Sequence, residues 1–135
     1  MAARDKFREK VQQNAGPVLE SGEQVEAAVL GETGIETVSA IGNLLSTIRR
    51  LTGQKQAQLV IGTDRNLYLT RVGYFSPTKV KEVVEKQPWS SASVKVNPGP
   101  FGGFLHIGDH RLRYNRPYRE DAERVAQKAS GTATQ

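Results

Sequence analysis

The sequence predicts a small, mainly β domain with helices (class α+β), in which about seven short antiparallel strands form a barrel or a sandwich. Three observations predict this fold. Short segments of alternating apolar and polar residues recur along most of the 135 residues, and turn-forming residues separate them. The last segment changes to the spacing of an amphipathic helix, which we expect to cover the open end of the sheet. The chain is also long enough to bury its own core, and it has no cysteine with which to form disulfides.

The chain begins with a predicted helix from Ala3 to Ala15. Phe7 and Val11 stand four residues apart among charged neighbours, and Gly16-Pro17 supplies a stop signal. An isolated helix of this length is only marginally stable in water. We therefore expect it to dock on the domain or on a second copy of the chain.

Seven segments have the pattern of strands. In the first, Val25, Ala27 and Val29 alternate with polar or small residues, which predicts one face in contact with water. The second and third form the strongest local prediction, a hairpin, because short polar side chains at 63–66 can hydrogen-bond to their own backbone. The fourth also has helical spacing, but its valines favour a strand. The predicted strands are 23–31, 56–62, 67–72, 79–88, 91–97, 104–108 and 111–115.

Glycine and proline mark two breaks in the second half of the chain. Residues 98–100, Pro-Gly-Pro, are expected to interrupt it, and Gly102-Gly103 indicates a sharp bend or a bulge.

The C-terminal helix is predicted to begin at Pro117, since a proline in the first turn loses no hydrogen bond. Its apolar stripe includes Ala122 and Val125, and Gly131 is expected to end it. Residues 131–135 are expected to form a disordered tail.

The segment between the first two strands, residues 32–55, is too long for a hairpin loop. Apolar residues recur in it at helical spacing, and Arg49 and Arg50 follow them at the end where a helix favours cations. We interpret it as a helical insert that folds over the barrel or joins two copies of the chain. The alternative is an amphipathic segment that enters a membrane interface. The candidate interaction residues are Ile41, Leu44, Leu45, Ile48 and Leu51.

Charge is unevenly distributed along the chain, whose formal net charge is +5. Residues 11–48 contain no lysine or arginine, whereas residues 49–81 are rich in both. Such a run most often forms solvated strand faces. Its functional interpretation is an anionic ligand over one end of the sheet, or an acidic face of one copy that meets the basic face of another. The candidates for binding an anion or a lipid headgroup are Arg49, Arg50, Lys55, Arg71 and Lys79.

No motif in the sequence supports a catalytic, cofactor or metal site. The glycine-rich run 99–104 lacks the Lys-Ser/Thr ending of a phosphate-binding loop. His106 and His110 lie on either side of a predicted turn, and no motif supplies the carboxylates that a metal there would need. We expect no enzymatic activity, no cofactor and no metal.

The N-terminal residues lack the apolar core of a secretory signal. No stretch reaches the ~18 apolar residues of a membrane-spanning helix. We expect a cytoplasmic protein, with peripheral contact to a membrane as the alternative.

The stretch 59–71, Leu-Val-Ile-Gly-Thr-Asp-Arg-Asn-Leu-Tyr-Leu-Thr-Arg, resembles the second hairpin of bacterial pleckstrin-homology-like (PH-like) domains, which are related in fold to GRAM domains. Residues 18–23 resemble the segment that leads into their first strand, and residues 87–94 resemble the passage from the fourth strand to the fifth. The resemblance implies a seven-stranded, partly open antiparallel barrel capped by a C-terminal helix. The expected boundaries are 1–17 for an N-terminal helical extension, 18–130 for the PH-like domain with its insert at 32–55, and 131–135 for the tail.

The resemblance also implies a binding or scaffolding module, often self-associating in bacteria, rather than an enzyme. Eukaryotic lipid-binding members carry basic residues where this chain has Glu32 and Glu36, so the resemblance does not imply phosphoinositide binding. The leading hypothesis is a non-catalytic module that acts through contacts with another protein or with itself. Peripheral binding to anionic lipid through the basic candidates is the first alternative. The second is binding of single-stranded nucleic acid by aromatic residues interleaved with basic ones. Those aromatic residues are Tyr68, Tyr74, Phe75, Trp89 and Phe101.

Overall fold

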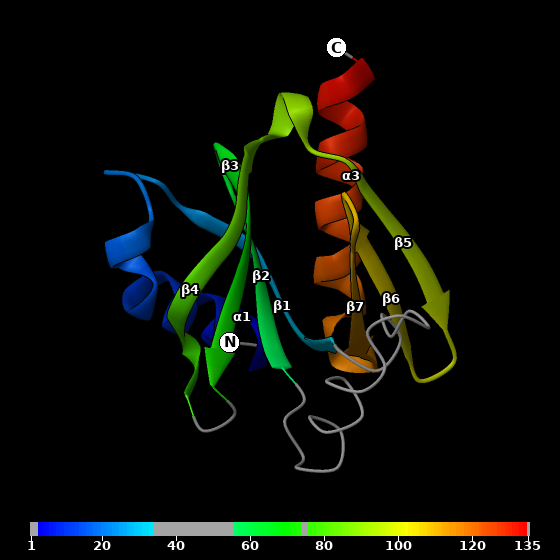
Figure 1. Cartoon of the computed structure of the whole chain (residues 1–135), viewed down its shortest axis with the longest axis horizontal. Coiled ribbons are helices and arrows are strands. Elements are labelled where there is room, and N and C mark those ends of the chain that lie inside the picture. Colours follow the sequence, from blue (N-terminus) through cyan, green and yellow to red (C-terminus); the bar gives the residue numbers. More distant parts are fainter. Residues whose placement is uncertain (1–2, 34–55, 74–75, 135) are drawn as a thin grey trace, which may run out of the picture.

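The computed structural model describes residues 3–33, 56–73 and 76–134. Its strands form one seven-stranded antiparallel sheet in the order β4-β3-β2-β1-β7-β6-β5 (Figure 1). The α+β class, the seven strands and both terminal helices are therefore confirmed, and the ambiguous fourth segment is a strand. The helices are α1 (Ala3–Asn14) and α3 (Arg119–Thr134), and short 3-10 turns are η1 (Gly16–Val18), η2 (Trp89–Ser91) and η3 (Arg116–Tyr118). The strands are β1 (Val25–Thr33), β2 (Gln56–Thr63), β3 (Asn66–Gly73), β4 (Ser76–Pro88), β5 (Val94–Gly99), β6 (Gly102–Ile107) and β7 (His110–Asn115).

The sheet consists of two meanders, β1 to β4 and β5 to β7, and it is not closed, because β4 and β5 are its two edges. The meanders meet where β1 pairs with β7 over a short stretch, Gly31 with Tyr114 and Glu32 with Arg113. This junction requires a glycine, since a Cβ on Gly31 would lie 2.4 Å from the carbonyl oxygen of Arg113. The strands therefore form an open sheet and not a closed barrel.

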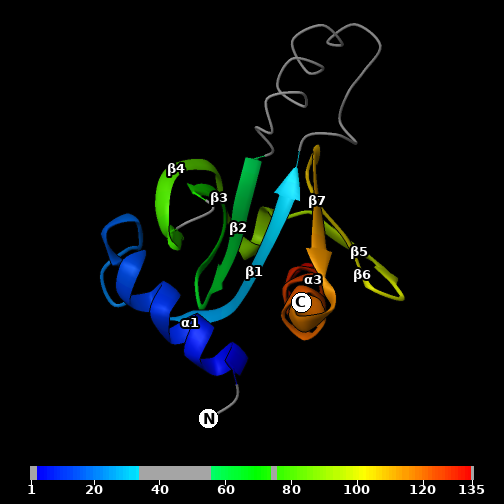
Figure 2. The same cartoon turned by 90° about the horizontal axis from the view of Figure 1, so that it is seen from below.

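Helix α1 covers one face of the first meander (Figure 2). Val11 and Ala15 are buried against Leu59, Ile61 and Tyr68. The opposite face of the same strands is buried as well, because Val60, Leu67 and Leu69 belong to a second hydrophobic cluster. The expectation that the first strands keep one face in water is wrong, since α1 occupies that face.

Helix α3 covers the inner side of the second meander and forms the main core with it. Ala122, Val125 and Ala129 are buried among residues of both meanders and beside Trp89. The ring nitrogen of Trp89 donates a hydrogen bond to the carbonyl oxygen of Thr63, 2.8 Å away. The predicted role of the last helix as the cover of the open sheet is confirmed.

The helix also satisfies backbone groups of β1 that no strand pairs. Asp121 Oδ2 accepts a hydrogen bond from the backbone nitrogen of Ala28 at 2.9 Å, and Arg124 donates one to the carbonyl oxygen of Glu26 at 3.1 Å. Arg8 of α1 donates to the same Asp121 carboxylate at 3.1 Å, so this buried acid has a cation partner. The first helix, the first strand and the last helix therefore meet at one carboxylate.

Two predictions based on glycine and proline are corrected. Gly102-Gly103 does not form a bulge, because β6 keeps a regular register with both neighbouring strands. The glycines are needed for space instead: a Cβ on Gly103 would lie 2.7 Å from the hydroxyl oxygen of Tyr114. Strand β5 continues through Pro98 to Gly99, which an edge strand allows because the missing N–H can face outward.

The end of the last helix also differs from the prediction. Gly131 does not adopt the left-handed conformation of a helix-ending glycine, and α3 runs on to Thr134. Residues 131–134, predicted to belong to a disordered tail, are therefore the last turn of α3. The helix also begins after Pro117 rather than at it, because residues 116–118 form the turn η3.

The predicted helical insert falls almost wholly outside the residues that the structure describes. Residues 34–55 lie outside the described ranges, and with them Ile41, Leu44, Leu45, Ile48 and Leu51. Across the described ranges, no helix combines the length and the hydrophobicity that crossing a lipid bilayer requires.

Candidate binding surface

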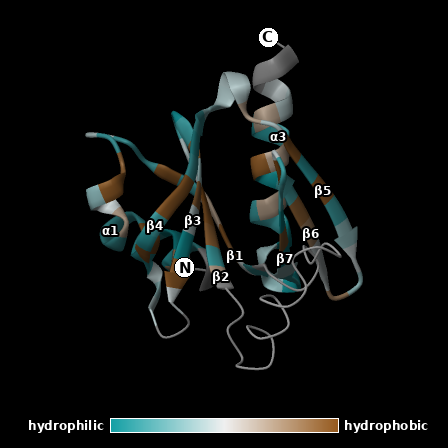
Figure 3. Cartoon of the chain, viewed as in Figure 1, coloured by the Kyte–Doolittle hydropathy of each residue, from teal (hydrophilic) through white to brown (hydrophobic). Residues whose placement is uncertain are grey.

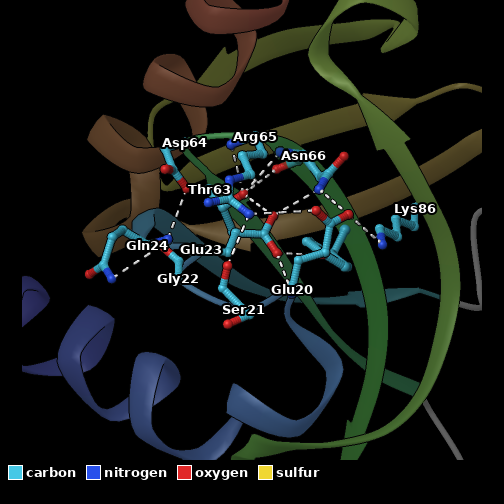
Figure 4. A network of polar contacts seen from close by, with 11 residues as sticks. Glu20, Ser21, Gly22, Glu23, Gln24, Thr63, Asp64, Arg65, Asn66 and Lys86 are labelled. Atoms are coloured by element: carbon cyan, nitrogen blue, oxygen red, sulfur yellow. Dashed lines mark hydrogen bonds and ion pairs between the residues drawn. The ribbon is translucent and has the colours of Figure 1, made fainter.

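Glu23 is the centre of a polar network that ties the start of β1 to the turn between β2 and β3 (Figure 4). Its side chain is buried. One carboxylate oxygen accepts hydrogen bonds from the backbone nitrogen of Glu20 (2.8 Å) and the hydroxyl of Tyr68 (2.6 Å). The other accepts from the amide of Asn66 (2.9 Å) and from the hydroxyl of Thr63. A buried carboxylate is thus held by donors from two distant segments.

The donors decide the protonation state of this acid. Burial alone would raise the pKa of Glu23, but hydrogen bonds from Thr63 and Tyr68, with those from Glu20 and Asn66, hold the pKa below its ordinary value. Burial and the neighbouring carboxylate raise the pKa of Tyr68, so its hydroxyl remains a donor. The carboxylate is ionised, fully hydrogen-bonded and shielded from solvent, which suits a structural role and not proton transfer.

The loops around Glu23 are joined by a second set of contacts. The backbone nitrogen of Gln24 donates to Asp64 Oδ1 at 2.8 Å, and that of Asp64 donates to the carbonyl oxygen of Gln24 at 3.0 Å. The Arg65 guanidinium reaches the carbonyl oxygen of Ser21 at 3.0 Å. The two sequence stretches that most resemble PH-like domains, 18–23 and 59–71, therefore contact each other and stabilise the fold.

The predicted anion-binding residues do not form one site within the described ranges. Arg71 lies on β3 and pairs with Glu82 of β4 at 3.0 Å, while Lys79 is exposed on β4. Arg49, Arg50 and Lys55 lie outside the described residues.

The predicted aromatic candidates are also separated. Tyr68 and Trp89 are buried core residues, whereas the Phe101 side chain is 84% exposed in the turn between β5 and β6. Tyr74 and Phe75 lie outside the described residues. Tyr68 and Trp89 are therefore not available to stack on a base, contrary to the prediction.

A different surface gathers cationic and ring side chains. On the second meander, Leu105, Leu112 and Tyr114 point into the core beneath α3. Because side chains alternate between the faces of a strand, the intervening residues lie on the outer face. Hydrophobic and hydrophilic residues alternate along β5 in this way (Figure 3). We call this outer surface the basic face; its residues are Lys95, Asn97, Phe104, His106, Arg111 and Arg113.

The basic face is cationic and open. None of its residues is acidic, and within the described part of the chain Lys95, Arg111 and Arg113 have no carboxylate partner. The Arg111 guanidinium lies 4.0 Å from the centre of the Phe104 ring, and its Nε is buried without a hydrogen-bond partner. Lys95 and Arg113 are exposed, while Arg111 is half-buried. Of the described helices, α3 packs on the inner side and α1 on the other meander (Figure 2).

Three acidic residues around the start of β1 have partners within the chain. Glu23 is buried in its network, Glu20 pairs with Lys86 at 2.9 Å, and Glu26 pairs with Lys128. These glutamates therefore already have partners within the chain.

A hollow of about 400 Å³ opens near the junction of β1 and β7. Its described lining is largely apolar or uncharged, with Leu30, Ala57 and Tyr118, and its charged residues are Glu32 and Arg113. The described residues contain no cluster of histidine and acidic side chains suited to a metal ion. The basic face is therefore the better candidate for a functional surface.

The basic face was not among the surfaces predicted from the sequence. The signal was present in the alternation of residues 94–97, 104–107 and 111–114. Only the register of β5 against β6 and of β6 against β7 shows that the outward residues of the three strands are neighbours.

Fold and surface together define a small antiparallel α+β domain with one open cationic sheet face. The chain matches no family model and no curated protein.

Proposed function

We propose that this chain is a non-catalytic PH-like binding module and that its basic face binds an anionic partner. The observation that carries the proposal is the gathering of Lys95, Arg111 and Arg113 on the outer face of β5, β6 and β7, three strands that contain no acidic residue; the acidic neighbour across the junction is Glu32 of β1, opposite Arg113. Unpaired cations on one surface raise the local concentration of an anionic partner and speed its association.

The PH-like part of the proposal is supported by the topology. A four-stranded and a three-stranded meander meet at β1 and β7, and a C-terminal helix covers the opening. The network around Glu23 uses the same residues that carry the resemblance in the sequence.

The non-catalytic part is supported by the use of the buried acids. Glu23 and Asp121 are both buried and both occupied by hydrogen bonds within the fold. Catalytic acids and bases need access to a substrate proton, and these two carboxylates lack it.

A second copy of the chain is a weaker candidate partner for the basic face. Three of the described N-terminal glutamates, Glu20, Glu23 and Glu26, are engaged within their own chain. We therefore assign the face to a different anionic molecule.

Retention on a heparin column tests this function. The variant Lys95→Glu/Arg113→Glu reverses two charges on the basic face, and Lys79→Glu/Lys81→Glu changes the net charge equally on exposed positions of β4. We expect the first variant to elute at clearly lower salt than the second. Equal elution of the two would show that net charge alone governs retention, and the proposal would then be abandoned.

A further inference from the structure

We propose that the partner of the basic face is single-stranded nucleic acid. This inference rests on the proposed function and names its ligand. It follows from where the rings and the cations of the basic face lie relative to each other.

The basic face is a grid of two rows across three strands. In the first row, Phe104 of β6 lies between Asn97 of β5 and Arg113 of β7. In the second, His106 of β6 lies between Lys95 and Arg111. The rows are about 7 Å apart, since they are two residues apart along an antiparallel strand. Each row therefore has a ring side chain in the middle and hydrogen-bond donors on its flanks.

This arrangement matches both parts of a nucleotide. Base stacking on aromatic or guanidinium planes contributes to binding of every base, while lysine and arginine beside the rings contact phosphates. The Arg111 guanidinium lies over the Phe104 ring at 4.0 Å, so the ring fixes one side of a planar cation. The other side of that plane can stack on a base, and the terminal nitrogens of the guanidinium are the groups that can donate to a phosphate oxygen, since the Nε is buried.

Single strands fit the surface better than a duplex does. A duplex is read by a helix or a two-stranded ribbon that enters its major groove, and the basic face is the broad side of a three-stranded sheet. Stacking on the central rings requires bases that are not already stacked on each other, which a single strand provides. The exposed Phe101 lies at the end of β6 nearest the first row. Its ring can stack on a further base of a nucleic-acid strand that extends beyond that row.

The position of the rings also argues against a membrane or an acidic peptide. Phe104 and His106 are half-buried in the middle of the sheet, so they cannot insert into the acyl boundary of a bilayer. An acidic peptide would pair with the cations but would leave the central rings without a role. Nucleic acid uses both.

Fluorescence anisotropy with a labelled oligothymidylate of about 12 nucleotides tests the inference, because that length covers the surface of a small domain. We expect log Kobs to fall with log salt at a slope of about −2, from three cations that each contribute about 0.7. Lys95→Glu/Arg113→Glu should reduce the slope to about −0.7. The matched variant Lys79→Glu/Lys81→Glu should leave the slope at the wild-type value.

The ring contribution is measured with Phe104→Leu, which keeps an apolar residue at a half-buried position. We expect binding to weaken by about tenfold at constant salt slope, because the ring that holds the Arg111 guanidinium plane in place for stacking is lost. Circular dichroism and thermal melting confirm that each variant is folded.

Three outcomes would overturn the inference. They are the absence of an anisotropy change at low salt, equal losses in the two charge variants, and unchanged binding by Phe104→Leu. A parallel sedimentation assay with phosphatidylglycerol vesicles separates this failure from that of the proposed function. If vesicles or heparin bind through Lys95 and Arg113 while the oligonucleotide does not, the nucleic-acid inference falls and the binding module stands.

Discussion

Replacing Glu23 with glutamine should strongly destabilise the fold. The carboxylate is buried and accepts hydrogen bonds from Glu20, Thr63, Asn66 and Tyr68. A glutamine retains one acceptor oxygen and places an NH2 group where a second pair of donors points. With the NH2 group toward Glu20 and Tyr68, the Tyr68 hydroxyl must become an acceptor and the backbone nitrogen of Glu20 loses its partner. With the NH2 group toward Thr63 and Asn66, the Thr63 hydroxyl must accept and the Asn66 amide keeps only its bond to the Glu20 carboxylate.

The magnitude follows from these contacts. A buried donor without a partner costs about 1–3 kcal/mol, and the remaining bonds lose the contribution of the charge. We expect Glu23→Gln to lower the free energy of unfolding by about 2–4 kcal/mol at neutral pH. That corresponds to a fall in melting temperature of roughly 10 °C for a domain of this size.

The loss should depend on pH in a defined direction. The pKa of Glu23 in the folded state lies below its ordinary value of 4.5, so the ionised carboxylate contributes stability above that value. This contribution is lost as the pH falls through the lower pKa of the folded state. Glutamine does not titrate, so the difference between the wild type and the variant should shrink below pH 4.5.

Urea denaturation at about pH 7 and about pH 3.5 measures both effects. Glu20→Gln is the comparison variant: it removes the same charge from a neighbouring, solvent-exposed side chain that pairs with Lys86, and its amide oxygen can still accept the hydrogen bond from Asn66. We expect its denaturation midpoint to stay close to that of the wild type. A Glu23→Gln midpoint equal to the control, or a difference that grows in acid, would refute this account of the network.

Three further perturbations test the packing of the fold. Gly31→Ala places a Cβ 2.4 Å from the carbonyl oxygen of Arg113, so urea denaturation should show a loss of about 1–3 kcal/mol as the two meanders separate. Asp121→Ala leaves the backbone nitrogen of Ala28 without its acceptor and removes the buried one of the two acidic partners of Arg8, and thermal melting should show a loss of about 3 kcal/mol. Deletion of residues 1–15 removes α1 from an apolar sheet face, so we expect increased binding of a hydrophobic dye and association in light scattering. Unchanged midpoints in the first two cases, or a dye-free monomer in the third, would contradict these contacts.

Local patterns were sufficient to predict most of the elements. The hairpin of β2 and β3 was predicted from alternation and from the turn residues Thr63 to Asn66, and both kinds of information are local in sequence. The amphipathic stripe of α3 likewise predicted which of its residues are buried, Ala122 and Val125 among them.

What the sequence could not predict depends on distant contacts. Tyr68 and Thr70 lie on the other face of β3 from Leu67 and Leu69, and nothing local in the sequence shows that α1 buries Tyr68 on that face as well. Glu23 has the appearance of a surface acid at the start of a strand, and its side-chain partners lie some forty residues later in the chain. The basic face has the same origin, because its rows form only when three strands are in register.

The Asp121 carboxylate joins segments from opposite ends of the described chain, since Arg8 is 113 positions away from it. When all seven strands have been synthesised, α3 has not, and α3 carries the carboxylate that accepts the hydrogen bond from β1. The backbone nitrogen of Ala28 therefore lacks this acceptor until the first turn of α3, which contains Asp121, has left the exit tunnel. The domain is therefore expected to acquire its native form only after synthesis of the described chain is nearly finished, and the long sequence separation of these contacts should slow that step.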